Sequence, residues 1–308
     1  MLRHRLFIYN NTRRSFKMKN KKTFLCIALI LMAIFPACAQ KNNNEKDFKV
    51  ITVDGGKGIE ITEYVGEERE VSIPPKIRNL PVIGIGDDAF YQKRSIISVT
   101  IPNSVTSLGR RAFAECIYLS SITIPDSVTS IGEYTFSSCN NLTMVTLPDS
   151  VTSIGNLAFS GSGLISITIG NSVTSIGTSV FSECRSLSSV SIPDSVTTIA
   201  YGAFSDCESL TSVTIPDSVT SIGEKAFSHC ESLTSVTIPD SVTSIGAYAF
   251  SHCESLTSIM FQGTISSNNL HYDAFYCIGD LREKYLAGRA GTYKTTNPGY
   301  DAVWKKQS

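Results

Sequence analysis

The chain has 308 residues and a mass of 33.4 kDa, with 42% hydrophobic and 18% charged residues. This apolar content is high enough to bury a core and excludes a mostly disordered chain. The formal net charge is zero, but eight of the 27 cations lie within the first 22 residues, and no acidic residue precedes Glu45. Without that segment 19 cations face 27 anions. Such an acidic chain argues against nucleic-acid binding, which needs a basic face.

Residues 1–38 contain a predicted export signal. Three lysines precede an apolar run from Phe24 to Phe35, which is too short to span a bilayer but has the length of a signal-peptide core. Met18 is the expected start of translation, and whether residues 1–17 are translated is left open. Since no other segment could span a membrane, the only predicted membrane attachment is a lipid at the N-terminus.

Two cleavage sites compete at the end of this signal. Ala37-Cys38-Ala39 fits an A-x-A site with cleavage before Gln40. Residues 35–38 resemble a loose lipobox, in which Cys38 would be lipidated and become the first residue, although Phe35 replaces the usual leucine. We favour the lipoprotein because residues 42–47 form a polar tether. The mature chain then begins at Cys38, or otherwise at Gln40.

The next segment predicts an N-terminal cap. Apolar residues alternate around residues 50–53 and again at Ile59 and Ile61, which is the period of two that strands show. We expect two diverged strands to cover the first repeat, and we assign residues 39–69 to the tether and this cap.

One repeat fills the middle of the chain. A phenylalanine recurs at intervals of 22 to 25 residues, and a fixed period in the twenties indicates a solenoid. The fold class is therefore an α/β, β-rich solenoid of about nine 23-residue coils over residues 70–278. The recurring phenylalanines are Phe90, Phe113, Phe136, Phe159, Phe181, Phe204, Phe227, Phe250 and Phe275.

Each coil begins with a predicted strand. In the coil that starts at Leu210, Val213 and Ile215 alternate around Thr214 and face inward. Pro216 ends the strand because proline cannot donate to a sheet ladder. Stacked coils would align these strands in a parallel sheet on one face, about 4.8 Å apart.

The rest of the coil returns along the other face. Asp217-Ser218 predicts a turn, since both side chains bond nearby backbone amides, and Val219 and Ile222 point inward. Gly223 relaxes the next corner. Residues 224–227 predict a short helical or 3-10 turn that directs Phe227 into the core.

One coil is irregular. Residues 159–164 lose one position and the cysteine that follows the phenylalanine elsewhere, and Gly170-Asn171 replaces Pro-Asp in the next coil. We expect a local change of curvature, and we favour sequence drift over a functional notch.

Residues 279–308 predict a C-terminal cap. Residues 280–286 have the composition of a short helix with Asp280 as its N-cap. Trp304, the only tryptophan, is expected to pack on the last coil. Solenoids need such ends because an open stack exposes its core and its strand edges.

The repeat LxxIxIPxxVxxIxxxAFxxCxxL resembles the BspA-like, treponemal-type family of bacterial leucine-rich repeat proteins. Other leucine-rich repeats carry an asparagine ladder, and Ser127 and Ser218 stand near that place here. The resemblance implies a curved solenoid exported to a bacterial surface. It also implies an adhesin that binds extracellular-matrix proteins such as fibronectin, or host and partner cells.

The cysteines and histidines could support two other kinds of chemistry, disulfide formation and zinc binding. Six cysteines, from Cys116 to Cys253, each follow a repeat phenylalanine by three residues and form an inward ladder. Disulfides between coils are geometrically open, but buried free thiols are favoured. His229 and His252 lie on adjacent coils and could bind zinc. Because the neighbouring Cys230 and Cys253 point inward, the histidines are expected to point outward.

Metal and catalytic sites are weakly indicated elsewhere. A row of aspartates could attract Ca²⁺, but their place in turns explains them without metal. Ser162 lacks the GxSxG spacing of a hydrolase. We therefore expect no enzyme, no cofactor and no metal. The aspartates are Asp126, Asp149, Asp194, Asp217 and Asp240.

The predicted site is a flat face of small hydroxyls on the outward strand positions. It contains no aromatic or arginine anchors and suits many weak contacts with a large partner, although such residues also serve as plain soluble strand positions. We expect a monomer that binds a matrix or cell-surface protein; the alternative is a periplasmic or envelope module with a bacterial partner. The candidate residues are Ser120, Ser121, Thr123, Ser188, Ser189, Ser191, Thr211, Ser212, Thr214, Thr234, Ser235 and Thr237.

Overall fold

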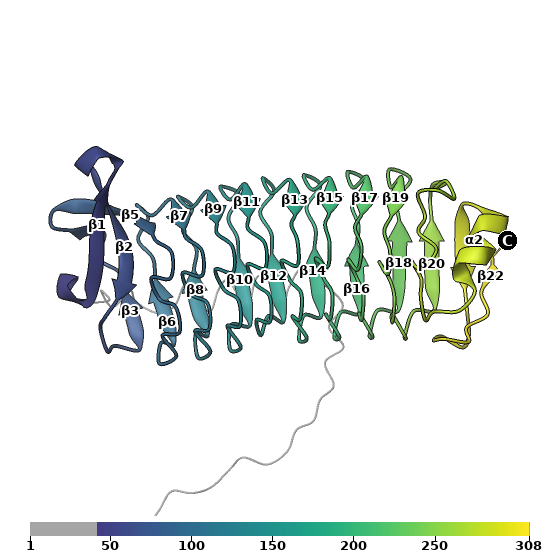
Figure 1. The fold of residues 1–308 in the computed structure, drawn as a ribbon, viewed down its shortest axis with the longest axis horizontal. Coiled ribbons are helices and arrows are strands. Elements are labelled where there is room, and N and C mark those ends of the chain that lie inside the picture. Colours follow the sequence, from purple (N-terminus) through teal and green to yellow (C-terminus); the bar gives the residue numbers. More distant parts are fainter. Residues whose placement is uncertain (1–41, 308) are drawn as a thin grey trace, which may run out of the picture. The chain divides into compact units, whose positions relative to one another are not determined.

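The structure is a computed structural model that describes residues 42–307. These residues belong to one unit, in which successive coils stack along one axis (Figure 1). The predicted export signal, its two cleavage sites and Cys38 lie outside the described residues. Within residues 42–307, no helix combines the length and the apolar character needed to cross a membrane.

The first row of strands is the predicted parallel sheet. Neighbouring strands pair in register, for example Val190 with Val213, and the central residue of each strand is buried. The row divides into one sheet of β3, β6 and β8 and another that begins at β10. Its strands are β3 (Glu70–Ser72), β6 (Ser98–Thr100), β8 (Ser121–Thr123), β10 (Met144–Thr146), β12 (Ser166–Thr168), β14 (Ser189–Ser191), β16 (Ser212–Thr214), β18 (Ser235–Ile238) and β20 (Ser258–Phe261).

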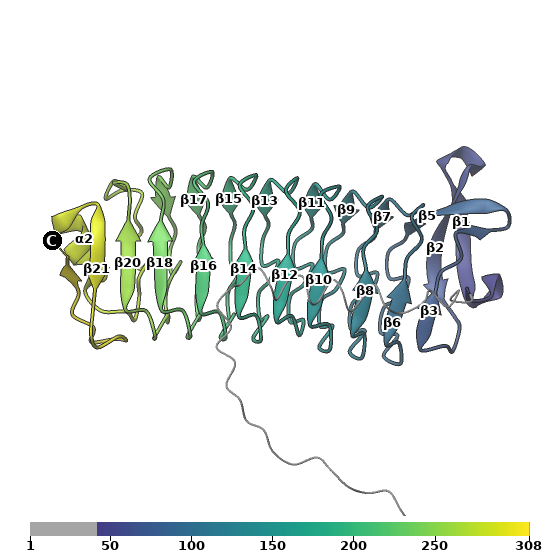
Figure 2. The same cartoon turned by 180° about the vertical axis from the view of Figure 1, so that it is seen from behind.

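A second row of strands runs beside the first in both views (Figures 1 and 2). Sequence analysis places Ile222 inward but misses this strand, because two residues cannot display a period of two. β4 (Lys76–Ile77) pairs antiparallel with the first strand of the row. The row consists of β5 (Leu80–Ile85), β7 (Ser107–Leu108), β9 (Ser130–Ile131), β11 (Ser153–Ile154), β13 (Ser175–Ile176), β15 (Thr198–Ile199), β17 (Ser221–Ile222) and β19 (Ser244–Ile245).

The third side of each coil is a chain of single turns, each closed by a hydrogen bond between residues three apart as in a 3-10 turn, and the turns do not continue into a helix. Ala226 and Ser228 donate their N–H groups to carbonyls three residues earlier in the same coil. Lys225 and His229 adopt left-handed φ values of 56° and 57°. Their N–H groups, and that of Phe227, bond to the next coil instead. The left-handed residues prevent a continuous helix and give each coil a third column of hydrogen bonds to its neighbour.

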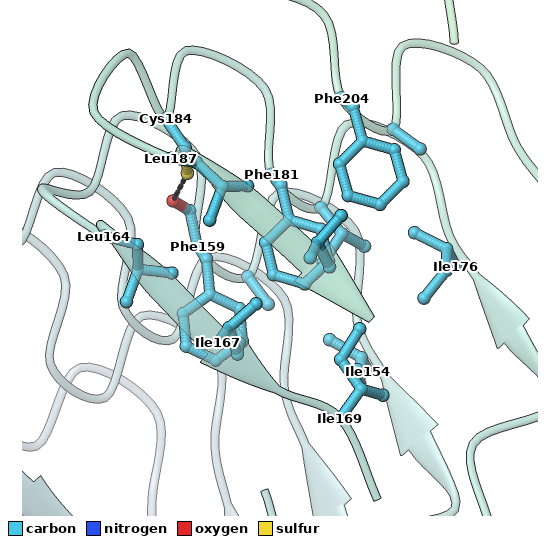
Figure 3. Packing of buried hydrophobic residues seen from close by; sticks show 14 of the residues in the cluster. Ile154, Phe159, Leu164, Ile167, Ile169, Ile176, Phe181, Cys184, Leu187 and Phe204 are labelled. Carbon is cyan, nitrogen blue, oxygen red and sulfur yellow. Dashed lines mark hydrogen bonds between the residues drawn. The ribbon is translucent and has the colours of Figure 1, made fainter. Parts of the chain in front are cut away.

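The phenylalanine column is the spine of the core. From Phe90 to Phe275 neighbouring ring centroids lie 4.9 to 5.7 Å apart. Tyr64 extends the stack at the N-terminal end, 5.2 Å from Phe90. Figure 3 shows Phe159, Phe181 and Phe204 in this stack beside buried leucines and isoleucines.

The cysteine ladder consists of buried free thiols, as the sequence favours. Each Sγ donates to the carbonyl oxygen of the phenylalanine one coil earlier; Cys207, for example, bonds to Phe181 at 3.2 Å. Burial raises the pKa of Cys116, Cys184 and Cys253 to about 12. These thiols therefore stay protonated at neutral pH.

The corner glycines are required by close packing rather than by backbone freedom. A Cβ added to Gly132 would lie 2.6 Å from the carbonyl carbon of Gly109, one coil earlier. The same clash occurs at Gly223, whose φ is not positive. Sequence analysis names the right residue at this corner but the wrong reason.

The irregular coil interrupts the second row. β11 and β13, which are 22 residues apart, belong to different sheets. Asn156 partly replaces the missing ladder, because its Oδ1 accepts from the N–H of Thr178 at 3.2 Å. Ser162 takes the place of the absent cysteine, and its Oγ lies 3.4 Å from the Sγ of Cys184. The same Sγ donates to the carbonyl oxygen of Phe159 at 3.2 Å (Figure 3).

The N-terminal end is covered by two strands, as predicted. The short 3-10 helix η1 (Glu45–Asp47) precedes β1 (Phe48–Val53), and η2 (Asp54–Gly56) links β1 to β2 (Gly58–Tyr64). β1 and β2 are antiparallel, and β2 continues in parallel onto β5.

The C-terminal end is covered by α2 (Leu281–Gly288), β21 (Gly291–Lys294) and β22 (Lys305–Lys306). β21 pairs antiparallel with β20 and so covers its edge. Trp304 is fully buried, as expected, and its Nε1 donates to the carbonyl of Ile278 at 2.7 Å. Asp280 precedes the helix but makes no side-chain cap; its Oδ1 accepts from the N–H of Trp304 instead.

Candidate functional site

The predicted site forms one continuous surface, which we call the hydroxyl face. It consists of three outward columns along the first row of strands: the residue before each strand, the first strand residue and the third strand residue. In β16 these are Thr211, Ser212 and Thr214, which flank the buried Val213. All twelve predicted residues lie on this face. Eleven are exposed and Ser188 is half-buried.

The first column is partly occupied by the fold itself. The hydroxyl of Thr211 donates to the carbonyl of Ser188 at 3.2 Å, one coil earlier. Ser120, Ser188 and Thr234 make the same contact with their preceding coils. These four hydroxyls hold one coil to the next, because they extend the backbone ladder beyond the short strand. Sequence analysis does not separate them from the others.

The predicted residues of the second and third columns remain open to a partner. The hydroxyls of these eight residues make no side-chain hydrogen bond to any described residue. With strands about 4.8 Å apart and residues two apart along each strand, these side chains form a regular two-dimensional array. The eight predicted residues in these columns are Ser121, Thr123, Ser189, Ser191, Ser212, Thr214, Ser235 and Thr237.

Exposed apolar side chains interrupt the hydroxyl face in more than one coil; Met260 on β20, for example, is 41% exposed. Met144 and Ile165, which are 64% and 50% exposed, occupy positions that hydroxyl residues hold in most other coils. A shallow hollow of about 500 Å³ lies nearby, between residues 146–150 and 168–171. Gly170 lies at its floor, and a Cβ there would meet the backbone of Pro148. The irregular coil thus alters the surface as well as the ladder.

A second array of threonines was missed by sequence analysis. These threonines precede the second-row strands and are exposed, and most donate to the carbonyl one coil earlier, as Thr129 does to Thr106 at 3.2 Å. The signal was the threonine that follows the buried valine in the recurring motifs VTSI, VTSL and VTTI. The column comprises Thr106, Thr129, Thr152, Thr174, Thr197, Thr220 and Thr243.

The serine of each Pro-x-Ser turn serves as the inner ladder of this solenoid. Ser127 donates its hydroxyl to the carbonyl of Val105 at 2.5 Å, and Ser218 donates to Val196 at 2.6 Å. Sequence analysis places both serines near the usual asparagine ladder. The turn chemistry that it assigns to Ser218 is wrong in detail, because the partner is a carbonyl of the preceding coil rather than a nearby amide.

His229 and His252 point outward, as expected. Their rings stack 4.3 Å apart with 8° between the planes, and both are half-exposed. Within residues 42–307, no three metal-ligating side chains lie close enough together to hold an ion. The predicted aspartate row is exposed along the turns.

Ser162 does not have the surroundings of a nucleophile. It is 3% exposed, and its hydroxyl contacts the thiol of Cys184 rather than a general base. Its position explains the residue: it fills the small buried site that cysteine holds in the other coils.

The repeat pattern matches a known family. Six copies of a BspA-type leucine-rich repeat region are recognised over residues 83–209 and 174–289, which together cover more than half of the chain. The chain belongs to the BspA-type leucine-rich repeat family. This confirms the resemblance and the solenoid fold. Members of this family are repeat scaffolds that are not typically enzymatic.

Solved structures of the same kind are similar to this chain. A leucine-rich repeat protein of Treponema pallidum shares 33% identity, covers 63% of this chain and 91% of its own, and has a TM-score of 0.60. A leucine-rich repeat protein of Bacteroides ovatus shares 28% identity, covers 73% and 72% of the two chains, and has a TM-score of 0.58. No curated protein matches the chain.

Proposed function

We propose that this chain is an exported bacterial surface protein that binds a large protein partner through its hydroxyl face. The partner class is an extracellular-matrix or host cell-surface protein, such as fibronectin. The observation that carries the proposal is the regular array of exposed hydroxyls that the eight predicted residues form in the second and third columns. These eight hydroxyls are free to bond a ligand, whereas the first-column hydroxyls of Ser120, Ser188, Thr211 and Thr234 already serve the fold.

The environments of Ser162 and of the cysteines within residues 42–307 are consistent with this proposal. Ser162 is buried beside a thiol, and the buried cysteines are protonated at neutral pH. Many weak hydrogen bonds along a long stack give strength by repetition. The role is therefore binding rather than catalysis, and the predicted export signal supplies the route to the surface.

Charged substitutions in the second column test whether the hydroxyl face binds the partner. A triple variant, Ser189→Arg, Ser212→Arg and Ser235→Arg, places three bulky cations on neighbouring exposed positions. We expect it to lose at least tenfold in affinity for immobilised matrix proteins, measured with residues 40–308. Equal binding by the variant and the parent chain would refute a role for this face.

The matched control uses the same coils and the same substitutions. Ser186→Arg, Ser209→Arg and Ser232→Arg each lie three residues earlier, in the turns that precede the same strands. This control should bind like the parent chain. A similar loss in both variants would mean that added charge, rather than the hydroxyl face, weakens the contact.

Protease treatment of intact cells tests the location. Loss of residues 40–308 without lysis would agree with a surface adhesin. Survival until the envelope is broken would place the chain in the periplasm, and the alternative of an envelope module with a bacterial partner would replace the adhesin.

A further inference from the structure

The C-terminal cap contains a second surface feature, separate from the hydroxyl face. A hollow of about 300 Å³ opens between the last coil and the start of α2, at the yellow end of Figure 1. Three tyrosines on its wall are 71%, 47% and 72% exposed. The hollow is lined in part by Tyr272, Tyr276, Tyr300, Asp273, Arg282 and Glu283.

Two of these tyrosine rings are held in place by neighbours that leave them exposed. The ring of Tyr276 lies 5.8 Å from Tyr248 and 5.9 Å from His252, both in edge-on contact. The ring of Tyr272 lies 4.3 Å from His271, whose Nδ1 accepts from the N–H of Asp273 at 3.1 Å. Rigid aromatic side chains lose little conformational entropy when they bind a ligand. The hollow is therefore organised before any ligand arrives.

Polar groups stand next to these rings. Asp273 and Glu283 supply carboxylates, and Arg282 supplies a guanidinium whose Nη2 is anchored on the carbonyl of Leu270 at 3.3 Å. Two acids against one base give the hollow a negative field. The field also acts on Tyr248, whose pKa is raised chiefly by the charge of Asp273. An anionic ligand would be repelled here.

We propose that this hollow binds a neutral sugar ring of a glycan. A sugar ring has apolar C–H faces, which can pack on the tyrosine rings, and hydroxyls at its edge, which can bond to Asp273, Glu283 and Arg282. The volume lies at the lower end of small-ligand sites. The two carboxylates in the lining disfavour a protein partner, because Asp and Glu are depleted in the cores of protein interfaces. The proposal does not depend on the hydroxyl face.

The experiment applies residues 40–308 to an array of neutral bacterial, plant and mammalian oligosaccharides and of sialylated mammalian glycans. The best neutral tetrasaccharide is then titrated with the fluorescence of Trp304 as the readout. Trp304 is the only tryptophan of the sequence and is buried in the same cap. We expect saturable binding of neutral glycans and at least tenfold weaker binding of sialylated counterparts.

Tyrosine variants locate the site. Tyr272→Ala and Tyr300→Ala remove rings that are more than 70% exposed, so the fold should be kept, and each should weaken glycan binding at least tenfold. Tyr118→Ala and Tyr201→Ala remove rings that are 52% and 44% exposed elsewhere on the stack, and they should bind like the parent chain.

Two results would overturn the proposal. One is the absence of saturable binding to any neutral glycan, or binding that the variants of Tyr272 and Tyr300 leave unchanged. The other is loss of matrix-protein binding in these two variants without any glycan binding, which would assign the hollow to a protein. Neither result bears on the arginine variants of the hydroxyl face, so the two proposals can fail separately.

Discussion

Among single residues, the buried thiols make the clearest contribution to the pH dependence of stability. Cys253 is fully buried, and its Sγ donates to the carbonyl of Phe227 at 3.3 Å. Burial raises the pKa of this thiol from 9.0 to about 12. Below pH 9 the folded and unfolded chains both keep the proton, so this thiol adds no pH dependence. Between pH 9 and 12 the unfolded chain loses the proton and the folded chain keeps it, so stability falls as the pH rises.

We therefore predict that Cys253→Ala flattens the alkaline loss of stability. The difference between the variant and the parent chain should change by about 1.4 kcal/mol per pH unit above pH 9. Urea unfolding at pH 8, 9 and 10 measures it. Other alkaline groups, such as lysines and tyrosines, cancel in the comparison because both chains contain them. If the free energy of unfolding depends on pH in the same way in the two chains, burial does not raise the pKa of this thiol.

Most inward residues could be predicted from the sequence, because the repeat places the same side chain in the same environment in every coil. The phenylalanine and cysteine columns followed from spacing alone. The division of the hydroxyl face could not, because Thr211 and Thr214 differ only in whether a carbonyl of the neighbouring coil lies within reach. The C-terminal hollow could not either, since Tyr300 lines it together with Tyr272 and Tyr276 from a cap that has no period.

At the scale of elements, the contact between neighbouring coils decides which substitutions the corners tolerate. At Gly132 an added Cβ would lie 2.6 Å from backbone, whereas at Gly177, beside the irregular coil, the nearest atom is a side-chain oxygen of Asn156 at 3.2 Å. Ala200 already occupies the corner of the coil after Gly177. A methyl group is therefore tolerated at this corner in some coils and would clash with backbone in others.

We predict that Gly132→Ala lowers the free energy of unfolding by about 1–3 kcal/mol, since neighbouring backbones must move apart. Gly177→Ala, the matched substitution, should change it by less than about 1 kcal/mol, because a side chain can move aside. Denaturant unfolding of the two variants gives the comparison. Equal losses would mean that the corner needs glycine for its backbone rather than for its packing.

Because some strands are very short, only part of the secondary structure could be predicted from the sequence. β16 was predicted because Val213, Thr214 and Ile215 alternate before a proline. β17 contains only Ser221 and Ile222, and its strand character comes from pairing with β15 and β19. Such strands are defined by tertiary contacts, and no local sequence pattern predicts them.

For the whole molecule, the irregular coil is a weak interface of the stack. The stability of a solenoid is close to a sum of repeat and nearest-neighbour terms, so the stack should open first where a neighbour term is smallest. The second row is interrupted between β11 and β13, and there Asn156 makes a side-chain contact where the regular coils have a backbone ladder. The phenylalanine stack continues through this place, with Phe159 and Phe181 5.6 Å apart. The pairing of β10 with β12 also continues, as do turn-side backbone bonds such as that from the N–H of Leu157 to the carbonyl of Thr178 at 3.0 Å, so this interface lacks one of its three columns of hydrogen bonds.

We predict that the amides of β11 and β13 exchange with solvent faster than those of β15 and β17 in native-state hydrogen exchange. Inserting one residue between Gly163 and Leu164 restores the 23-residue spacing. It should join β11 to β13 and slow their exchange to the rate of the regular coils. The matched insertion between Asn140 and Asn141 lengthens a regular coil and should speed exchange at β9 and β11. If the first insertion destabilises the stack as much as the second, the short coil is an adapted part of the solenoid and not its weak point.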